Sequence, residues 1–543
     1  MGKNKTNFLV QGSILAFAGI LVRVIGIIYR VPVQNILGTE GTTYYGVAYD
    51  VYSLFLLISS MSMPLAVSKI VSMKLAKNEI KNAYKAFVGA LIVGLVIGIV
   101  VSSIIFYGAD FFAEMWKYPS ASYAIKMLAP VLLIMSVLGV LRGFFQGMGT
   151  MMPTAISQIL EQVANAIVSI VGAYFLFKTG KAAGQSAAFG AAGSTLGTLV
   201  GAIVAFVFLI CVYLLYVPVL RKQLRRNRMV PEESYQDLTK ELMLTIMPVL
   251  LSTAVYNFSS ILDSGVFGNI CSRVFHMKEE VYSSMYGMYS GWYKLLTTAP
   301  IAIASALSSA IVPSIIRSIV ANDNKTAINK IESSMRLTMI VAIPAGMGLS
   351  VLGGPILKLL FSVDPAVEGE ATKLMILSVV TVMVFAMSTI SNAVLQGINK
   401  MKTPIINAAI GMVVHYIALI FMLIVFKPNL YAVVIGDIIF GLVVCILNAI
   451  SIYRYIGYKQ ELFKTFALPL IASAIMGVIT ILVYKISYMV VAMNSVACLL
   501  AIFVAVVAYA LSLLLIKGIS EEEILMLPKG SKIVSILRKY SLI

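Results

Sequence analysis

The chain has 543 residues, of which 60% are hydrophobic and only 12% are charged, and its formal net charge is +18. Soluble globular domains carry about 25% charged residues, so this composition indicates a polytopic membrane protein and excludes a secreted factor, a cytosolic enzyme and a disordered regulator. The lysines and arginines lie between apolar runs, where they are typical topology signals, so the positive charge does not predict a nucleic-acid partner.

Apolar segments long enough to cross a bilayer recur along the whole chain. A spanning helix needs about 20 mostly apolar residues, and about fourteen segments meet that requirement. The first begins at Leu9 and lacks a small-residue cleavage site, so we expect a retained helix and not a signal peptide. The predicted spans are residues 9–29, 44–66, 84–107, 121–146, 153–177, 186–216, 241–262, 284–316, 334–360, 372–397, 404–426, 430–453, 464–487 and 492–516.

The charge of the loops predicts the orientation. With the N-terminus inside, the inner segments hold more than twice as many lysines and arginines as the outer segments. The positive-inside rule therefore places both termini in the cytoplasm. The longest inner loop carries the sequence RKQLRRNR from Arg221 to Arg228, which we expect to contact anionic membrane lipid rather than a protein partner.

The two halves of the chain resemble each other. The segment YGVAYDVYSLFLLISSMSMP from Tyr45 resembles YGMYSGWYKLLTTAPIAIAS from Tyr286, and LRGFFQGMGTMMP ending at Pro153 resembles NAVLQGINKMKTP ending at Pro404. The offsets are similar, so span two maps onto span eight and span four onto span ten. Six helices then form the repeat. Because six is even, we expect two lobes related by an axis along the membrane normal, as in transporters with parallel repeats.

This repeat divides the chain into three parts. We expect an N-lobe at residues 1–230 with spans one to six, a C-lobe at 231–455 with spans seven to twelve, and two appended helices with a cytoplasmic tail at 456–543. Two lobes that meet at an axis across the membrane suit alternating access. A single-lobe receptor or a membrane glycosyltransferase would not need this architecture.

Motifs for catalysis are missing from the sequence. It contains no Walker A motif, no GxSxG elbow and no DxD in a loop, and its longest inner loop is too short for an ATPase domain. The four cysteines and two histidines have no recognised metal-ligand spacing, so we expect neither a metal nor a cofactor. The sequence therefore predicts a transporter that is not an enzyme and that runs on an ion gradient, the membrane potential or the gradient of its substrate.

Charges inside the first two spans need an explanation, because each costs about 2.5 kcal/mol or more at bilayer depth. Arg23 and Arg30 lie on one helical face of the first span, and Asp50 lies in the second span at a depth that matches Arg23. Two interpretations stay open. The two side chains form a buried ion pair that fixes packing, or Arg23 faces a cavity and Asp50 can release it, which would serve transport better.

Three further charges belong to the predicted site. Lys294 lies deep in span eight with no acidic residue within four positions, so we expect it to face water or an anionic ligand. Arg142 ends span four near the cytoplasm, where snorkelling is the alternative to a binding role. Glu161 in span five has Asn165 one turn further on, which fits either a hydrogen-bonded helix seam or a binding site.

Together these charges predict the class of substrate. The predicted lobe interface is cationic and suits a phosphate-bearing head group, because an arginine binds two oxygens at once. An exporter of lipophilic cations would instead present unpaired carboxylates. Asp437 in span twelve is a candidate ion or proton site, and His415 in span eleven is expected to be a core histidine. The predicted substrate-binding residues are Arg23, Arg30, Asp50, Arg142, Glu161 and Lys294.

Three motifs carry a resemblance to a known family. They are GxxYRxPxxxxLGxEG at residues 26–41, MPLAVSKIVS at 63–72 and RGFFQGMGTMMPTAISQ at 142–158. With these motifs, and over its whole length, the chain resembles the polysaccharide-transporter branch of the multidrug/oligosaccharidyl-lipid/polysaccharide (MOP) exporter superfamily. Within this branch it is similar to the MurJ-type lipid II flippases of Gram-positive bacteria and to the stage V sporulation protein B group.

The resemblance implies a flippase in the bacterial plasma membrane. Its substrate would be an undecaprenyl-diphosphate-linked cell-wall precursor, in the first place lipid II, moved from the inner to the outer leaflet through a cationic cavity. The family's basic residues of helices one and eight correspond to Arg23, Arg30 and Lys294. Gram-negative members also carry arginines in helix two, where this chain has Asp50.

Other functions fit the sequence less well. The nearest alternative is a flippase for another lipid-linked oligosaccharide, such as capsule, exopolysaccharide or teichuronic-type units. A cation-coupled drug antiporter is disfavoured by the arginines. A membrane glycan polymerase would need a large outer loop with catalytic residues, and the outer segments predicted here are short.

Overall fold

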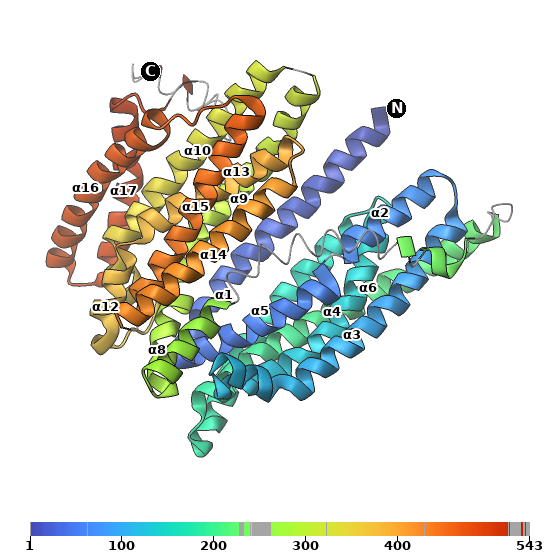
Figure 1. Ribbon diagram of the computed structural model, residues 1–543, viewed down its shortest axis with the longest axis horizontal. Coiled ribbons are helices and arrows are strands. Elements are labelled where there is room, and N and C mark those ends of the chain that lie inside the picture. Colours follow the sequence, from blue (N-terminus) through green and yellow to red (C-terminus); the bar gives the residue numbers. More distant parts are fainter. Residues whose placement is uncertain are drawn as a thin grey trace. The chain divides into compact units, whose positions relative to one another are not determined.

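The computed structural model describes residues 2–61, 63–226, 233–238, 240–241, 262–321, 323–427, 429–519, 521, 534–535 and 538. In these ranges the chain is helical with short connections and forms no β-strand (Figure 1), which confirms the predicted all-helical class. The chain divides into two compact units, Met1–Gly287 and Met288–Ile543. The predicted lobe boundary at residues 230 and 231 lies outside the described residues and stays a prediction.

The first unit consists of long helices joined by short turns. A π-helical turn, Leu57–Met61, links the first helix to the second, and three consecutive pairs, α3–α4, α2–α3 and α5–α6, pack against each other. The α-helices of this unit whose whole length is described are α1 Gly2–Leu56, α2 Met63–Ala76, α3 Ile80–Trp116, α4 Ser122–Gly147, α5 Met152–Gly180, α6 Ser186–Arg226 and α8 Glu279–Gly287.

Helix α1 contains the first predicted span and residues 44–56 of the second. Its backbone leaves helical geometry at Gly38, where φ is 67° and ψ is −175°, so two helices meet at this residue. Positive φ is unfavourable for residues with a Cβ atom, and glycine is therefore the residue suited to this bend. The sequence predicted a break between the two spans, and the structure places it at Gly38.

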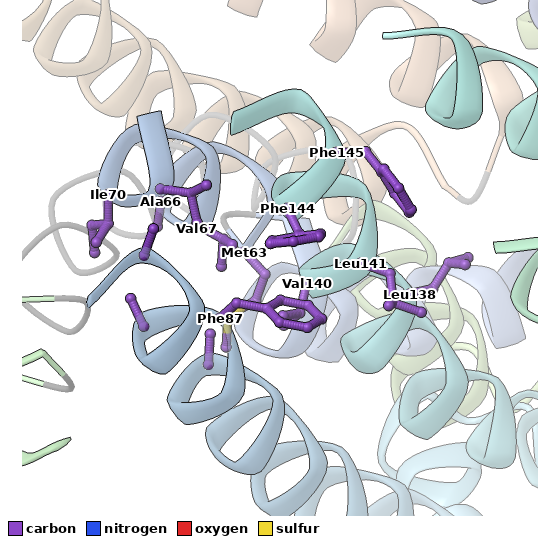
Figure 2. Packing of buried hydrophobic residues seen from close by; sticks show 14 of the residues in the cluster. Met63, Ala66, Val67, Ile70, Phe87, Leu138, Val140, Leu141, Phe144 and Phe145 are labelled. Atoms are coloured by element: carbon purple, nitrogen blue, oxygen red, sulfur yellow. The ribbon is translucent and has the colours of Figure 1, made fainter. Parts of the chain in front are cut away.

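Helices α2, α3 and α4 share an apolar core (Figure 2). The rings of Phe87 and Phe144 stack with centroids 4.2 Å apart, and Met63, Val67 and Val140 are buried beside them. These side chains come from three helices, so their burial fixes the helices to one another. Dispersion and area burial are the main terms that such packing contributes.

The predicted basic inner loop begins as helix. Residues Arg221 and Arg225 are exposed on the last turns of α6, and Arg228 lies outside the described residues. Further along, Glu233 forms an ion pair with Lys74, which is 5% exposed at the end of α2. Glu233 is therefore anchored to the C-terminal end of α2.

The second unit contains the remaining helices. Its core is formed chiefly by α9, α10, α13 and α15, with Ile343, Val382 and Ile390 fully buried. The helices of this unit are α9 Lys294–Val320, α10 Asn324–Val351, α11 Gly353–Leu360, α12 Pro365–Met375, α13 Ser378–Gly397, α14 Lys402–Val425, α15 Leu430–Ile456, α16 Leu468–Val491 and α17 Asn494–Leu515. A π-helical turn, Met288–Tyr293, precedes α9.

The two appended helices pack on the second unit through α10 (Figure 1). The hydroxyl of Tyr509 on α17 donates to the carbonyl of Ile340 at 2.8 Å, and Arg336 donates to the carbonyl of Gly518 at 2.9 Å. Ala472 of α16 and Leu513 of α17 are buried with Ile340. The last pair of helices is therefore an integral part of this unit.

The sequence repeat has the same local structure in both units. Gly149 N–H donates to the carbonyl of Gln146 at 2.9 Å, and Asn399 N–H donates to the carbonyl of Gln396 at 3.0 Å. Gly149 has φ 81° and Asn399 has φ 62°. Each turn ends one helix, α4 or α13, and the next helix begins directly after it with a proline in its first turn. The duplicated motif is thus a duplicated helix–turn–helix.

Eleven described helical segments are long and apolar enough to cross a membrane. Three of the fourteen predicted spans account for the difference. The single segment Phe17–Leu56 overlaps predicted spans one and two, residues 242–261 of span seven lie outside the described residues, and the side chains of residues 306–314 in span eight are likewise outside the description. The membrane-protein class is confirmed, and the count of fourteen stays a prediction.

Glu461 caps the start of the appended helices from outside the spans. Its carboxylate accepts hydrogen bonds from the N–H groups of Lys464 and Thr465, each at 2.9 Å. Burial raises the pKa of Glu461, but these N–H donors outweigh burial and lower the pKa below its ordinary value of 4.5.

We expect Glu461→Ala to lower the free energy of unfolding by about 1 kcal/mol, the usual effect of a lost helix cap. A lowered folded-state pKa means that this stabilisation is full above pH 4.5 and is lost as the pH falls through the folded-state value. Denaturation of the purified protein at pH 7 and below pH 4 measures both effects. An equal difference between wild type and variant at both pH values would contradict this assignment.

Candidate functional site

Two arginines project from α1 on the amino-terminal side of its bend. Arg23 and Arg30 are both exposed, and seven residues of helix place them on the same face. Arg23 forms no ion pair with any residue in the described ranges. Two arginines therefore share one face of α1, and neither forms an ion pair with a described carboxylate.

Tyrosine hydroxyls surround Arg30. Its guanidinium lies within electrostatic reach of the hydroxyls of Tyr29, Tyr45 and Tyr49. The rings of Tyr45 and Tyr49 are 4.6 Å apart, and the Tyr29 and Tyr45 hydroxyls are hydrogen-bonded at 3.3 Å. These tyrosines come from both sides of the bend at Gly38, so the bend brings them together around one arginine.

A second layer of polar side chains on α5 and α6 holds these tyrosines. Asn165 Nδ2 donates to the Tyr29 hydroxyl at 3.4 Å, and the Tyr49 hydroxyl is hydrogen-bonded to Thr198. Ser169 donates to Asn165 Oδ1 at 2.8 Å. The sequence analysis missed this network, although the spacing of Tyr45 and Tyr49 by four residues marks one helical face.

Asp50 and Arg23 are not paired. The Asp50 carboxylate accepts a hydrogen bond from the Ser264 hydroxyl at 2.6 Å. Arg23 lies outside the distance of an ion pair to every described carboxylate, including this one. The interpretation of a packing ion pair between Arg23 and Asp50 is therefore wrong, and the exposed Arg23 fits the cavity-facing alternative.

Arg142 and Glu161 are brought together. Arg142 Nη2 donates to Glu161 Oε2 at 2.7 Å, and Arg142 Nε donates to Ser157 Oγ at 3.0 Å. Arg142 is only 8% exposed, so its side chain does not snorkel to the cytoplasm. The ion pair joins α4 to α5. It also partly neutralises the Arg142 guanidinium, which can bind two oxygens at once.

Lys294 belongs to the second unit, at the first position of α9. It is half-buried, and its Nζ lies 5.8 Å from the centre of the Tyr289 ring. Within the described ranges it forms no ion pair with a carboxylate, in agreement with the expectation from the sequence. A lysine stacked on an aromatic ring keeps its ammonium group available to an anion.

Near Lys294 lies the acidic residue that the sequence singled out as an ion or proton site. The Tyr289 hydroxyl donates to Asp437 Oδ2, and a ring nitrogen of His415 lies within 4.8 Å of an Asp437 oxygen. His415 is fully buried, as expected for a core histidine. Within the second unit, Tyr289 therefore contacts Lys294 with its ring and Asp437 with its hydroxyl.

Comparisons with known proteins agree with this architecture. A model of the polysaccharide biosynthesis protein family matches residues 9–319. Lipid II flippase MurJ of Bacillus subtilis (strain 168) is 26% identical over 484 residues, covering 87% of each chain. Stage V sporulation protein B of the same organism is 24% identical over 484 residues, covering 88% of this chain and 89% of that protein.

Solved structures show the same fold. A lipid II flippase MurJ in an inward closed conformation has a TM-score of 0.66 at 16% identity and covers 92% of this chain and 97% of its own. An inward-facing multidrug resistance MATE transporter of the MOP superfamily has a TM-score of 0.62 at 14% identity and covers 80% and 94%. Because the family model covers more than half of the sequence, the chain belongs to the polysaccharide biosynthesis protein family, and it has the multi-span fold of the MOP superfamily.

Proposed function

We propose that this protein is a flippase that moves a lipid-linked anionic glycan precursor, in the first place lipid II, from the inner to the outer leaflet of the plasma membrane. The observation that carries the proposal is the exposed pair Arg23 and Arg30 on one face of α1, with no carboxylate to neutralise Arg23 in the described ranges. A diphosphate offers the oxygens that guanidinium groups bind in pairs. The 26% identity to a lipid II flippase over most of both chains supports the same substrate class.

The proposed binding residues have different tasks. Arg23, Arg30 and Lys294 would contact the diphosphate, and Asp50 would tune the local charge beside them. Arg142 and Glu161 would hold α4 against α5 and thereby frame the site. Both termini would lie in the cytoplasm, and a coupling ion or the membrane potential would drive the cycle through alternating access of the two lobes.

A second candidate is a flippase for another lipid-linked oligosaccharide, such as a capsule or exopolysaccharide unit. The matching family is described by polysaccharide biosynthesis and not by peptidoglycan, which favours keeping this alternative. Both candidates share the lipid-linked diphosphate, so they predict the same role for the arginines. They differ only in the glycan, which rescue of a strain depleted of its lipid II flippase would distinguish.

The test of the proposal is removal of the cations. We expect Arg23→Ala and Lys294→Ala each to abolish rescue of a bacterial strain depleted of its lipid II flippase. A charged hydrogen bond contributes about 1.5–3 kcal/mol, so flipping of lipid II in liposomes should fall at least about tenfold. Arg273→Ala removes an exposed arginine outside the proposed site and is the matched control.

Membrane levels of every variant are measured alongside rescue, so that loss of protein is not read as loss of transport. Full rescue by both Arg23→Ala and Lys294→Ala would refute the cationic site. Rescue by Arg23→Lys together with failure of Arg23→Ala would show that the charge matters more than the shape of the guanidinium group.

A further inference from the structure

A cavity of about 940 Å³ lies in the first unit, at the bend of α1. It is bordered by the connections from α3 to α4 and from α5 to α6 and by the start of α8, all of which the predicted topology places on the outer side. Its wall is rich in oxygen atoms from hydroxyl, amide and carboxylate groups. The polar residues that line it include Thr39, Glu40, Ser120, Gln185, Glu279 and Ser284.

The charge of this cavity is opposite to that of the arginine face. Three glutamates, including Glu40 and Glu279, line it against one lysine, Lys278. Glu279 Oε1 accepts from the Ser120 N–H at 3.1 Å, and Glu40 Oε1 accepts from the Tyr44 hydroxyl at 2.8 Å. Hydrogen-bond donors thus orient both carboxylates, and neither Glu40 nor Glu279 has an ion-pair partner in the described ranges.

The raised pKa of Glu279 agrees with this excess of negative charge. Burial raises the pKa of Glu279 above its ordinary value, hydrogen bonds from Ser120 and Tyr44 oppose this, and the nearby Glu40 carboxylate raises the pKa further. No described cationic side chain is among the groups that chiefly shift this pKa. A cation that entered the cavity would supply a compensating positive charge.

The cavity lies a short distance along α1 from the arginines. Leu37, the first wall residue, comes seven residues after Arg30, which corresponds to about 10 Å of helix. A head group that placed phosphates at Arg30 could therefore reach the acidic wall with a cationic group carried further out. Residues along α1 would then contact an anionic group and a cationic group of the same substrate molecule.

We propose that this cavity binds a primary ammonium group on the head group of the transported substrate. The proposal rests on the proposed function, because it takes the phosphates to lie at Arg30. An ammonium group offers three N–H donors, which match two carboxylates and the hydroxyl groups between them. Among the described residues, Glu40 and Glu279 do not converge with other ligand groups closely enough to coordinate a single metal ion. The cavity thereby selects lipid-linked glycans that carry a free amine.

The experiment compares two probes on the full chain in lipid nanodiscs. One is lipid II with a free side-chain amine on its peptide, and the other is the same molecule with that amine acetylated. We expect the free-amine probe to bind wild type about tenfold more tightly, which corresponds to about 1.4 kcal/mol. In the double variant Glu40→Gln/Glu279→Gln, the two probes should bind with equal affinity, because both carboxylates proposed to accept from the ammonium group are then neutral and the remaining Glu280 is balanced by Lys278.

Glu114→Gln provides the control, since Glu114 is an exposed glutamate near the end of α3 that does not line the cavity, and it should keep the tenfold preference. Equal binding of both probes to wild type would overturn the ammonium site and leave the proposed function standing. Failure of both probes to bind wild type would overturn the proposed function, and the ammonium site with it. A preference that survives in the double variant would also refute the assignment to this cavity.

Discussion

Replacing Glu161 with glutamine is expected to lower the free energy of unfolding by about 3 kcal/mol. The substitution leaves the Arg142 guanidinium, which is 8% exposed, without its carboxylate partner at 2.7 Å. Removing one member of a buried ion pair costs about 3–5 kcal/mol, and the partial exposure of Glu161 places the effect at the lower end. Thermal or denaturant unfolding of the purified protein in detergent measures this loss.

A double variant separates packing from transport. Apolar residues of similar volume often replace a buried ion pair without loss of stability, so Arg142→Met/Glu161→Leu should recover most of the 3 kcal/mol. We expect this variant to flip lipid II, because the pair frames the site and does not contact the substrate. A stable double variant that does not transport would place Arg142 in direct contact with the head group. Asp110→Asn, which breaks an exposed ion pair with Lys126, is the control and should cost less than about 1 kcal/mol.

The ion pair between α4 and α5 could have been derived from the sequence. Arg142 lies five residues before the end of α4, and Ser157 lies five residues after the start of α5. In a helical hairpin, residues equally far from the turn face each other, and the repeat motif marked this turn. The sequence analysis placed both charges correctly along the chain and missed that the hairpin joins them.

The expected pair of Arg23 and Asp50 failed for a different reason. Counting residues along two helices gives the depth of each side chain in the membrane, and this count placed Arg23 and Asp50 at equal depth. It does not give the direction in which either side chain points. The direction in which each side chain points around its helix depends on the bend at Gly38, where the backbone reaches φ 67°. The sequence indicates that a break is present but not its angle, so it could not decide between Arg23 and Ser264 as the partner of Asp50.

Periodicity and composition predicted the class of fold, the repeat and most of the spans, because an apolar run of sufficient length has few alternatives in a bilayer. They did not predict the tyrosines around Arg30. Tyr29 and Tyr45 are 16 residues apart and meet only because the chain turns between them. The outer cavity was missed for the same reason, since its wall is assembled from separate connections.

The second unit places amides at the positions that correspond to Arg142 and its hydrogen-bond partner Ser157 in the first. Asn448 Nδ2 donates to Ser391 at 2.9 Å and to Asn392 at 2.8 Å, and Asn407 Nδ2 donates to Asn448 Oδ1 at 2.8 Å. Asn392 and Asn407 flank the turn of the repeat as Arg142 and Ser157 do in the first unit. Duplicated hairpins are thus held by a neutral cluster in one unit and by charges in the other.

Asn448→Ala is expected to destabilise the protein by about 3 kcal/mol. Asn448 is fully buried, and its substitution removes its hydrogen bonds to Ser391, Asn392 and Asn407, each contributing about 1 kcal/mol. Asn329→Ala, at an exposed position of α10, is the matched control and should change stability by less than about 0.5 kcal/mol. Because the cluster carries no charge, the loss in Asn448→Ala should not depend on salt or on pH between 5 and 9. If the loss of stability in Asn448→Ala varied with pH, a titrating group would stabilise this hairpin. The distinction between a neutral cluster in the second unit and charges in the first would then be wrong.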